Sequence, residues 1–305
     1  MPGTLDASGA SPPDGPARHG GAALLPVLAL LANAFVWGVA WWPLRWLEVR
    51  GVHALWATAG VYLLALALLS LRWPRAWIEL AHTPSLWWLV LAAGMTNASF
   101  NWAVTIGDVV RVVLLFYLMP LWAVLLARVL LHERLTPLAA LRIVLALAGA
   151  AIVLRPDGGG WPWPQTLAEW LGVLGGFSFA LNNVLLRRHA ASGSAARALA
   201  MFAGGAFVAG ALATVLTLQG TVPPPPAPAP WLVGAAMLAL AFVGANLALQ
   251  YGAARLSAAA TAVVMVSEVL FASVSAIAIG AGTLSPALLA GGALIVAAAL
   301  LAAWR

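Results

Sequence analysis

Long apolar runs, separated by short stretches rich in Arg, Pro and Gly, divide this chain into ten segments. Each run is about 20 residues long, which is the length an α-helix needs to cross the hydrocarbon core of a bilayer. The ten predicted helices cover residues 22–43, 53–71, 86–106, 111–131, 136–154, 166–187, 198–218, 231–254, 257–280 and 285–304. The pattern therefore predicts an all-α membrane protein with ten transmembrane helices.

The second half of the chain repeats the first half at a constant spacing. Three positions of the third segment recur in the eighth, 149 positions later: Asn97 and Asn246, Asn101 and Gln250, Trp102 and Tyr251. Pro137 and Pro286 have the same spacing. Because each half holds five predicted spans, an odd number, the second copy must enter the membrane from the opposite side. We expect two inverted five-helix repeats, over residues 22–154 and 166–305.

The distribution of Arg residues predicts the orientation. With both termini in the cytoplasm, eleven Arg lie on the inner side, and four lie outside: Arg45, Arg50, Arg111 and Arg155. This excess satisfies the positive-inside rule, so we expect a multi-pass protein of a bacterial inner (plasma) membrane with both termini cytoplasmic. Residues 1–21 are rich in Pro, Gly, Ser and Ala and lack the order of a signal peptide, which predicts a disordered cytoplasmic tail.

Composition excludes several classes of function. With 63% hydrophobic and 8% charged residues, little of the chain remains for a soluble domain, so chemistry must occur between the helices. The isoelectric point near 11.2 comes from Arg at segment ends, which indicates topology rather than a nucleic-acid partner. The chain has no Cys, and its Gly-rich stretch at 158–160 lacks the Lys of a phosphate loop. We expect no catalytic residue, metal or cofactor, and no enzyme; the expected partners are a small-molecule substrate and the lipid bilayer.

One acidic residue falls inside the membrane. Glu268 lies eleven residues into the ninth segment, close to the bilayer centre. A carboxylate there costs about 2.5–3.5 kcal/mol on insertion scales, so it should face a wet cavity, pair with a cation or carry a proton. We expect Glu268 to bind a cationic group of the substrate or to couple transport to a proton; a purely structural carboxylate is the alternative.

Amide and aromatic side chains complete a candidate substrate-binding set. Asn97 and Asn101 share one helix face, as do their repeat partners, so two polar stripes could converge on one cavity. Trp37 and Trp41 lie one turn apart inside the first helix. The predicted set is Trp37, Trp41, Asn97, Asn101, Trp102, Tyr117, Asn246, Gln250, Tyr251 and Glu268. The alternative is interhelical hydrogen bonding for the amides and packing for the aromatics.

Three further features bear on helix ends. Pro43 and Pro120 can break the first and fourth helices. Asp108 and Arg111, three residues apart at the outer end of the fourth segment, are expected to form a local ion pair.

The stretch from Leu118 to Leu154 resembles the fourth and fifth helices of the drug/metabolite transporter superfamily, in particular its ten-helix EamA-type exporters. Met119-Pro120 stands where that family usually has Glu-Pro, and His132 to Thr136 stands for its loop motif. In the second half, Ser267-Glu268-Val269 keeps the Glu and loses the Pro. The sequence from Tyr117 to Pro120 is also similar to the aromatic amino acid exporter branch.

The resemblance implies a secondary transporter that exports small metabolites, with amino acids as the expected cargo, by alternating access through a central cavity between the repeats. A passive channel for small polar solutes and a membrane-embedded enzyme are the alternatives. The sequence leaves the coupling ion and the oligomeric state open, and a monomer is compatible with it.

Overall fold

The computed structural model describes residues 24–132, 136–155, 161–189, 191–227, 229–253, 255–256 and 258–303. The predicted tail over residues 1–21 and part of the loop motif, residues 133–135, lie outside this range. Fourteen helices and no strands form the described part of the chain, in agreement with the all-α prediction.

The helices of the first half are α1 (Leu24–Val39), α2 (Trp41–Glu48), α3 (Ala54–Arg72), α4 (Ala76–His82), α5 (Leu86–Ile106), α6 (Val109–Phe116), α7 (Met119–Leu130) and α8 (Pro137–Leu154). Those of the second half are α9 (Leu167–Arg188), α10 (Ser194–Leu218), α11 (Ala229–Ala253), α12 (Ala258–Met265), α13 (Ser267–Ala278) and α14 (Pro286–Ala303).

Every predicted apolar segment coincides with one helix or with two consecutive helices. The first, fourth and ninth segments are each divided, into α1 and α2, α6 and α7, and α12 and α13. Pro43 and Pro120 lie in the first turn of α2 and α7, just after the breaks that they were expected to cause. Seven of the described stretches are long and apolar enough to cross a membrane, and two shorter apolar helices accompany them. The chain is therefore a multi-pass membrane protein.

Helix α9 is as long as the spanning helices but more polar. It carries Glu169 in its first turn and two adjacent amides, Asn182 and Asn183, in its last two turns. Its N-terminus is fixed by a capping box, in which the side chains of Thr166 and Glu169 each accept a backbone N–H of the other residue.

Helix boundaries repeat at the same spacing of 149 positions as the polar residues. The bounds of α6 and α8, shifted by this number, coincide with those of α12 and α14, and the bounds of α7 differ from those of α13 by one residue. The break in the fourth segment therefore has a counterpart in the ninth, although the ninth has no Pro there.

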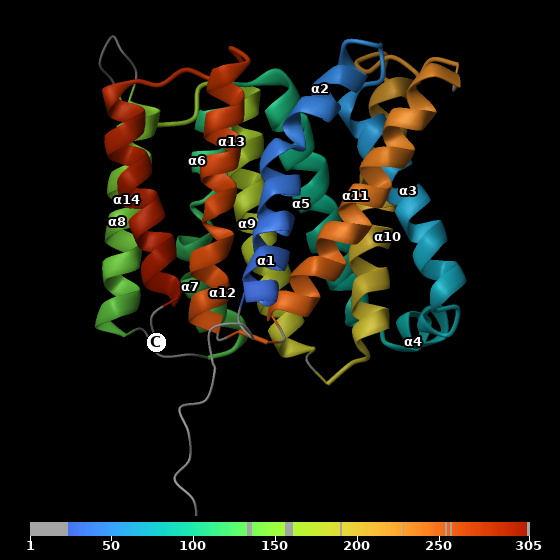
Figure 1. The fold of residues 1–305 in the computed structure, drawn as a ribbon, viewed down its shortest axis with the longest axis horizontal. Coiled ribbons are helices and arrows are strands. Elements are labelled where there is room, and N and C mark those ends of the chain that lie inside the picture. The colour runs from blue at the N-terminus through green and yellow to red at the C-terminus, as the bar shows by residue number, and fades with distance from the viewer. Residues whose placement is uncertain are drawn as a thin grey trace, which may run out of the picture.

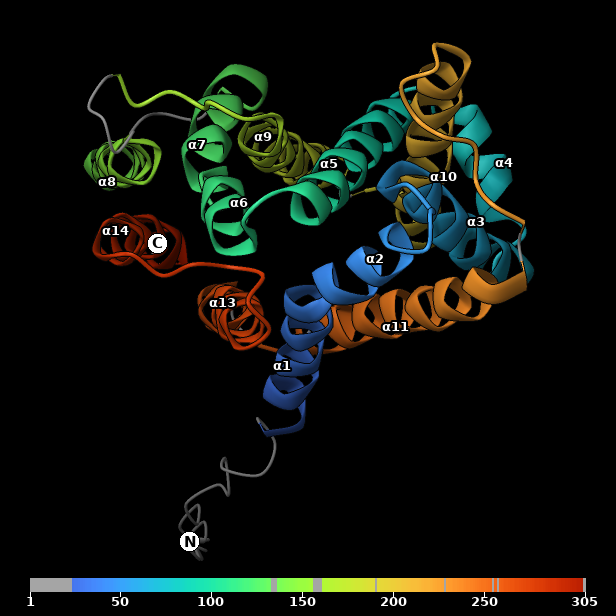
Figure 2. The same ribbon diagram turned by 90° about the horizontal axis from the view of Figure 1, so that it is seen from above.

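The helices form two facing rows, as seen from above in Figure 2. One row contains α5, α9 and the pair α6 and α7, and the other contains α1, α11 and α13. Helices α3 and α10 close one end of the assembly, and α8 packs on α14 at the other end. The most extensive helix pairings are α5 with α9 and α10, α8 with α14, α3 with α10, and α1 with α11.

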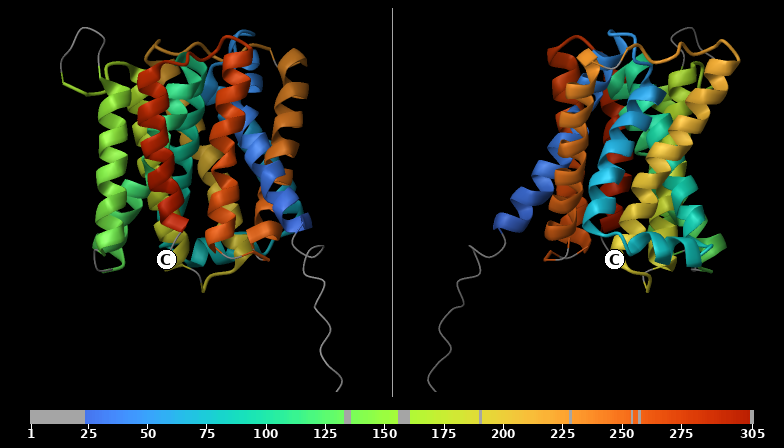
Figure 3. Two further views of the ribbon diagram at one scale, coloured as in Figure 1. Left: turned by 60° about the vertical axis from the view of Figure 1, so that its left-hand side comes forward. Right: turned by 90° about the vertical axis from the view of Figure 1, so that its right-hand side faces the viewer.

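Most of the helices run between two faces of the molecule (Figures 1 and 3). We call the face where α1 begins and α14 ends the terminal face. The opposite face is the one where α2 ends, α6 begins and α13 ends.

Candidate functional site

A cavity of about 720 Å³ lies between the two rows of helices. Its wall is mainly apolar and aromatic, with a few polar side chains, as is usual for a site that binds small molecules. The polar side chains that line it are Asn33, Tyr62, Thr96, Asn97, Tyr117, Asn182, Asn183, Asn246, Thr261 and Glu268. The large apolar ones include Trp37, Phe100, Phe116, Phe179 and Phe202. No Arg or His is among the described residues that line this cavity.

The cavity reaches the terminal face and stops before the opposite face. Its lining includes Ala253, the last residue of α11, which is exposed at the terminal face. On the other side, residues 41–48, 101–115 and 269–289 contribute nothing to the lining. The described structure is thus open toward the terminal face.

Hydrogen bonds and one ion pair between separate helices close the opposite face. Asp108 accepts the backbone N–H of Thr283 at 2.7 Å and its hydroxyl at 3.0 Å, which links the start of α6 to the loop before α14. Arg111 pairs with Glu169 of α9, with 2.7 Å between Nε and Oε1. Arg45 donates to the carbonyl oxygens of Val104 and Gly107 at the end of α5.

The expected local ion pair between Asp108 and Arg111 is wrong. Asp108 instead caps α6 by accepting the backbone N–H of Arg111 at 2.9 Å. The guanidinium of Arg111 turns to Glu169, because that carboxylate lies buried at the start of the neighbouring α9. Spacing along one helix predicted a contact within the segment, whereas packing supplied a partner from the other half of the chain.

Glu268 stands at the break between α12 and α13 and lines the cavity near the middle of its segment. The hydroxyl of Tyr117 donates to its Oε2 at 3.5 Å, and also lies 3.4 Å from the carbonyl oxygen of Met265. Tyr117 itself lies at the break between α6 and α7. The two helix breaks, one from each half of the chain, therefore meet at this carboxylate.

Gly38 of α1 allows α1 to approach α13 closely at the same level. A Cβ placed on Gly38 would lie 2.7 Å from the Cβ of Phe271 and 2.9 Å from the backbone oxygen of Glu268. Contacts this short exclude a side chain at position 38 unless one helix moves. Glu268 is thus held between α1 and Tyr117.

Five of the ten residues predicted for the site line the cavity: Trp37, Asn97, Tyr117, Asn246 and Glu268. Trp37 stacks on Phe242 with ring centroids 4.4 Å apart. Asn97 accepts the hydroxyl of Tyr62 and donates to the carbonyl oxygen of Ala93 at 2.8 Å. The polar atoms of Asn97 are therefore satisfied within the wall.

The other five predicted residues lie outside the cavity lining: Trp41, Asn101, Trp102, Gln250 and Tyr251. Trp41 is buried and donates to the hydroxyl of Ser275 at 3.0 Å. Asn101 is buried against α3, where it donates to Thr58 at 3.1 Å. Trp102 packs edge-on against the ring of His53, 5.2 Å between centroids. For these three residues the geometry matches the alternative of packing and interhelical bonding.

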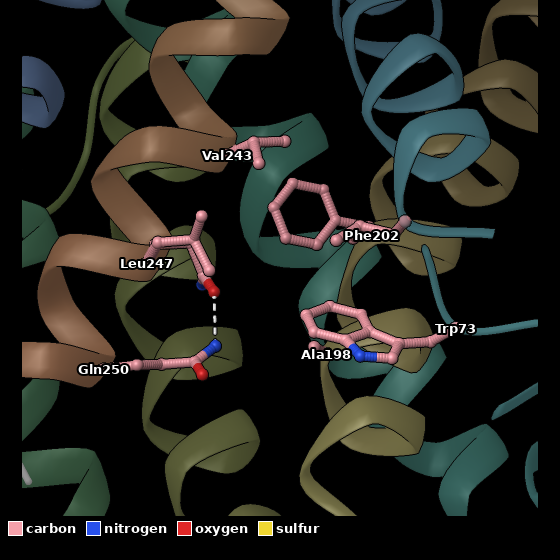
Figure 4. Close-up of a pocket in the computed structure, with 8 residues that line it drawn as sticks. Trp73, Ala198, Phe202, Val243, Leu247 and Gln250 are labelled. Atoms are coloured by element: carbon pink, nitrogen blue, oxygen red, sulfur yellow. Dashed lines mark hydrogen bonds between the residues drawn. The ribbon is translucent and has the colours of Figure 1, made fainter. Parts of the chain in front are cut away.

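Gln250 and Tyr251 lie near the C-terminal end of α11, which reaches the terminal face. Gln250 donates to Oδ1 of Asn246 at 2.7 Å, and both residues border a second, much smaller pocket with Trp73, Phe202 and Leu247 (Figure 4). Arg255 lies over the ring of Tyr251, 3.8 Å from its centroid. The polar stripe of α11 is therefore bonded mainly to itself, and only Asn246 borders the large cavity as well.

Sequence reasoning left several lining residues out of the predicted site. Three amides in apolar helices were visible in the sequence: Asn33, Asn182 and Asn183. Nothing in their spacing distinguished them from amides that only form hydrogen bonds between helices. Tyr62 and Thr261 gave no signal, because a Tyr or Thr in an apolar helix is ordinary. Periodicity defines the face of one helix and does not say which faces of several helices meet.

Three polar atoms of the wall are buried and have no hydrogen-bond partner: Oδ1 of Asn33, Oδ1 of Asn182 and Oγ1 of Thr261. Asn33 is 0% exposed and its Nδ2 donates to the carbonyl oxygen of Ala245 at 2.7 Å, so only its oxygen is unpaired. Asn182 is 2% exposed. A buried polar atom without a partner costs about 1–3 kcal/mol, which is unusual in a native structure.

Within the described residues, no group of three His, Cys, Asp or Glu side chains could hold a metal ion. The polar chemistry of the cavity comes from amides, hydroxyls and one carboxylate. Such a wall can bind and orient a small molecule.

Comparisons with known proteins agree with this architecture. Residues 24–155 match the EamA-like transporter family. The Chloramphenicol-sensitive protein RarD of Pseudomonas aeruginosa is 36% identical over 117 residues, which are 35% of this chain and 38% of that protein. The Uncharacterized transporter PA0485 of the same species is 37% identical over 91 residues, which are 28% and 30% of the two chains. The chain thus spans less than two fifths of the length of either relative.

A crystal structure described only as that of a protein superimposes on 91% of this chain and 96% of its own, with a TM-score of 0.56 and 19% sequence identity. At this identity the similarity concerns the fold alone.

Proposed function

We propose that this chain, which matches the EamA-like transporter family over residues 24–155, is a secondary transporter of a bacterial inner membrane. One observation carries the proposal: a cavity of about 720 Å³ lies between the helix rows, reaches the terminal face and is closed at the opposite face. A carrier that exposes its site to one side at a time requires this asymmetry.

Ten spans in two inverted repeats, 22–154 and 166–305, account for the arrangement. The repeated helix bounds support this assignment, as does the pattern of neighbours, since α1 packs on α11 as α9 packs on α5. If the halves are related by a two-fold axis in the membrane plane, each can take up the conformation of the other, which exchanges the open and closed faces. The Arg distribution then places the terminal face, with both termini, in the cytoplasm.

The cargo is a small metabolite with an amino group, and export is the direction. A cavity open to the cytoplasm is ready to accept cargo from inside the cell. Glu268 supplies the one carboxylate of the described lining, in a wall that is otherwise uncharged. Such a carboxylate either pairs with a cationic group of the cargo or exchanges a proton as the cavity changes sides. Amino acids are the first class to test.

Counterflow in proteoliposomes tests the proposal. Vesicles that contain the purified protein are loaded with unlabelled amino acids and amines in turn, and the entry of each labelled compound is followed with and without a pH gradient. Saturable exchange of one class establishes a carrier and identifies its cargo. Flux that neither saturates nor shows counterflow would establish the passive channel instead. Absence of any flux from folded protein would exclude amino acids and amines as the cargo.

A further inference from the structure

We infer that Arg187, in the last turn of α9, closes the terminal face when the cavity opens to the opposite side, by donating to the carbonyl oxygens at the C-terminal end of α11. The inference rests on the proposed transport function and identifies a contact of the second state of the carrier. Arg45 makes the corresponding contact in the state described above.

Arg45 of α2 holds the end of α5 at the closed opposite face. Its Nε donates to the carbonyl oxygen of Val104 at 2.8 Å, and its Nη2 donates to that of Gly107. The last carbonyls of a helix have no partner within the helix and carry the negative end of its dipole, so a guanidinium suits them. Because α2 continues α1, this contact ties together the two facing rows of helices (Figure 2).

The end of α11 shares a terminal hydrogen bond with the end of α5, 149 positions later. At the end of α5, the N–H of Gly107 donates to the carbonyl oxygen of Ala103 at 2.9 Å. At the end of α11, the N–H of Leu256 donates to that of Gly252 at 3.1 Å. The two acceptors of the guanidinium at the opposite face therefore correspond to the carbonyl oxygens of Ala253 and Leu256.

Helix α9 occupies in the second half the place that α1 and α2 occupy in the first. It packs on α5 and α7, as α1 packs on their counterparts α11 and α13. Trp37 of α1 and Phe179 of α9 both line the cavity and lie 142 positions apart. Arg45 and Arg187 have the same spacing. Arg187 is therefore the counterpart of Arg45.

Two close glycine contacts agree with this register. A Cβ on Gly38 of α1 would lie 2.9 Å from the backbone oxygen of Glu268. A Cβ on Gly176 of α9 would collide with the backbone oxygen of Phe116, whose counterpart in the second half lies three positions before Glu268. The residue that corresponds to Gly38 is thus expected about three positions beyond Gly176, and the spacing of 142 places it at Ala180, four positions beyond.

Arg187 lies on the side of α9 that faces the cavity. It follows the lining residue Asn183 by four positions, so the two side chains are about 40° apart around the helix axis. Arg188 is about 140° from Asn183, on the side turned away. Helix α11 borders the cavity from the facing row, where Leu249 and Ala253 line it. Arg187 and the end of α11 thus stand on opposite sides of the opening at the terminal face.

Exchange of the two conformations brings these groups together. The second half then takes up the arrangement that the first half has in the described state, and the end of α9 approaches the end of α11 as α2 approaches α5. The guanidinium of Arg187 has only donors, and the carbonyl oxygens of Ala253 and Leu256 only accept. The same contact that closes the opposite face then closes the terminal face.

Accessibility of one thiol in the cavity tests the inference without any cargo. Ala123→Cys places the single thiol of the chain in the cavity wall, and a membrane-impermeant maleimide is applied from the opposite face in oriented proteoliposomes. Arg45→Ala removes the present contact and should raise the labelling rate about tenfold, as expected for the loss of hydrogen bonds to a charged group. Adding Arg187→Ala should remove most of this rise, because the second state loses its own contact.

Arg188→Ala is the matched control. It removes the same charge from the same turn of α9, on the side turned away from the cavity. Added to Arg45→Ala, it should leave the labelling rate as high as in Arg45→Ala alone. Arg187→Lys retains a cationic donor and should preserve more of the rise than Arg187→Ala. Thermal unfolding in detergent shows that each variant is folded before it is labelled.

Each other outcome overturns the inference. An unchanged rate after addition of Arg187→Ala would show that this side chain does not close the terminal face. An equal loss with Arg188→Ala would assign the effect to charge alone. If Arg45→Ala does not raise the rate, its contact does not hold the opposite face, and the corresponding contact at α11 falls with it. Saturable counterflow together with any of these results would leave the transport function standing.

Discussion

Glu268 shows at the scale of one residue what an apolar environment demands. A carboxylate inside a membrane is retained only where water, a donor or a counter-charge reaches it. In this structure the described donor is the hydroxyl of Tyr117, at 3.5 Å, and the cavity lies beside it. The carboxylate is therefore held by a single long hydrogen bond and remains available to a cargo or a proton.

Glu268→Gln should abolish counterflow, because the amide removes the negative charge while it keeps the shape and the contact with Tyr117. The loss should be at least about a hundredfold in initial rate if a charge pair or proton transfer is required, equivalent to about 2.7 kcal/mol. Labelled-cargo entry in proteoliposomes measures it. Glu79→Gln is the matched control, since Gln keeps an acceptor for the backbone N–H of Gly193 far from the cavity. Unchanged counterflow in Glu268→Gln would assign this residue a structural role.

The amides show why the sequence could predict only part of the site. Asn97 and Asn101 share a helix face, as their spacing predicted, but only Asn97 reaches the cavity. Asn101 lies one turn farther along α5, where Thr58 of α3 covers it. The polar face of α5 was visible in the sequence, but the neighbouring helix α3 determines which of its two amides reaches the cavity.

At the scale of the element, small residues determine which helices can pack. Gly94 of α5 and Gly204 of α10 face each other: a Cβ on Gly204 would collide with the carbonyl oxygen of Val90, and one on Gly94 with Val208. The two backbones therefore approach more closely than larger side chains would permit. This contact holds one end of the row that contains α5.

Gly204→Ala should destabilise the protein by about 1–3 kcal/mol, because the added methyl group overpacks the interface of α5 and α10. Gly210→Ala, on the same helix, meets only Ala59 at an ordinary 3.6 Å and should be neutral or slightly stabilising through helix propensity. Thermal unfolding of both variants in the same detergent measures the contrast. Equal unfolding temperatures would show that the interface has room for the methyl group.

The N-terminus of α3 contains a cap that titrates. His53 accepts the backbone N–H of Leu55 through Nδ1 at 3.2 Å, and burial lowers the pKa of His53. The cap therefore needs the neutral imidazole. Since the folded-state pKa lies below the unfolded value of about 6.5, its stabilisation is complete above that value and is lost as the pH falls through the folded-state pKa.

His53→Ala should cost about 1 kcal/mol of stability at pH 8, in the range measured for helix caps, and the difference from the wild type should shrink toward pH 5. His53→Asn retains an acceptor that does not titrate and should keep its stability at both pH values. Unfolding temperatures at the two pH values decide the matter. A difference in unfolding temperature between His53→Ala and the wild type that grows on acidification would contradict a neutral cap.

At the scale of the whole molecule, polar links across the opposite face keep the cavity open to one side. Asp108 binds Thr283, and Arg111 binds Glu169, so that each link joins the first half of the chain to the second. The lining on the other side extends to the end of α11. If the halves exchange roles during transport, these links must break when the opposite face opens.

Asp108→Ala should therefore shift the protein toward a state that is open on the opposite face. The chain has no Cys, so Ala123→Cys introduces a single reporter thiol in the cavity wall. In oriented vesicles, a membrane-impermeant maleimide should label this thiol from the terminal face, and labelling from the opposite face should rise several-fold in Asp108→Ala. The same reporter thiol in a Thr214→Val variant is the control, since Thr214 is exposed on α10 and bonds Gly210 of its own helix. Unchanged labelling from the opposite face would show that other contacts close the cavity.

The sequence by itself determined the number and position of the apolar segments, the breaks near Pro43 and Pro120, and the isolated acid at position 268. These features depend on hydrophobicity and backbone restrictions along one stretch of chain, which are local properties. Only the tertiary structure decided that Asn97 lines the cavity while Asn101 does not, and that Arg111 pairs with Glu169. Those relations join helices far apart in sequence, and they follow from how closely small residues allow the helices to pack.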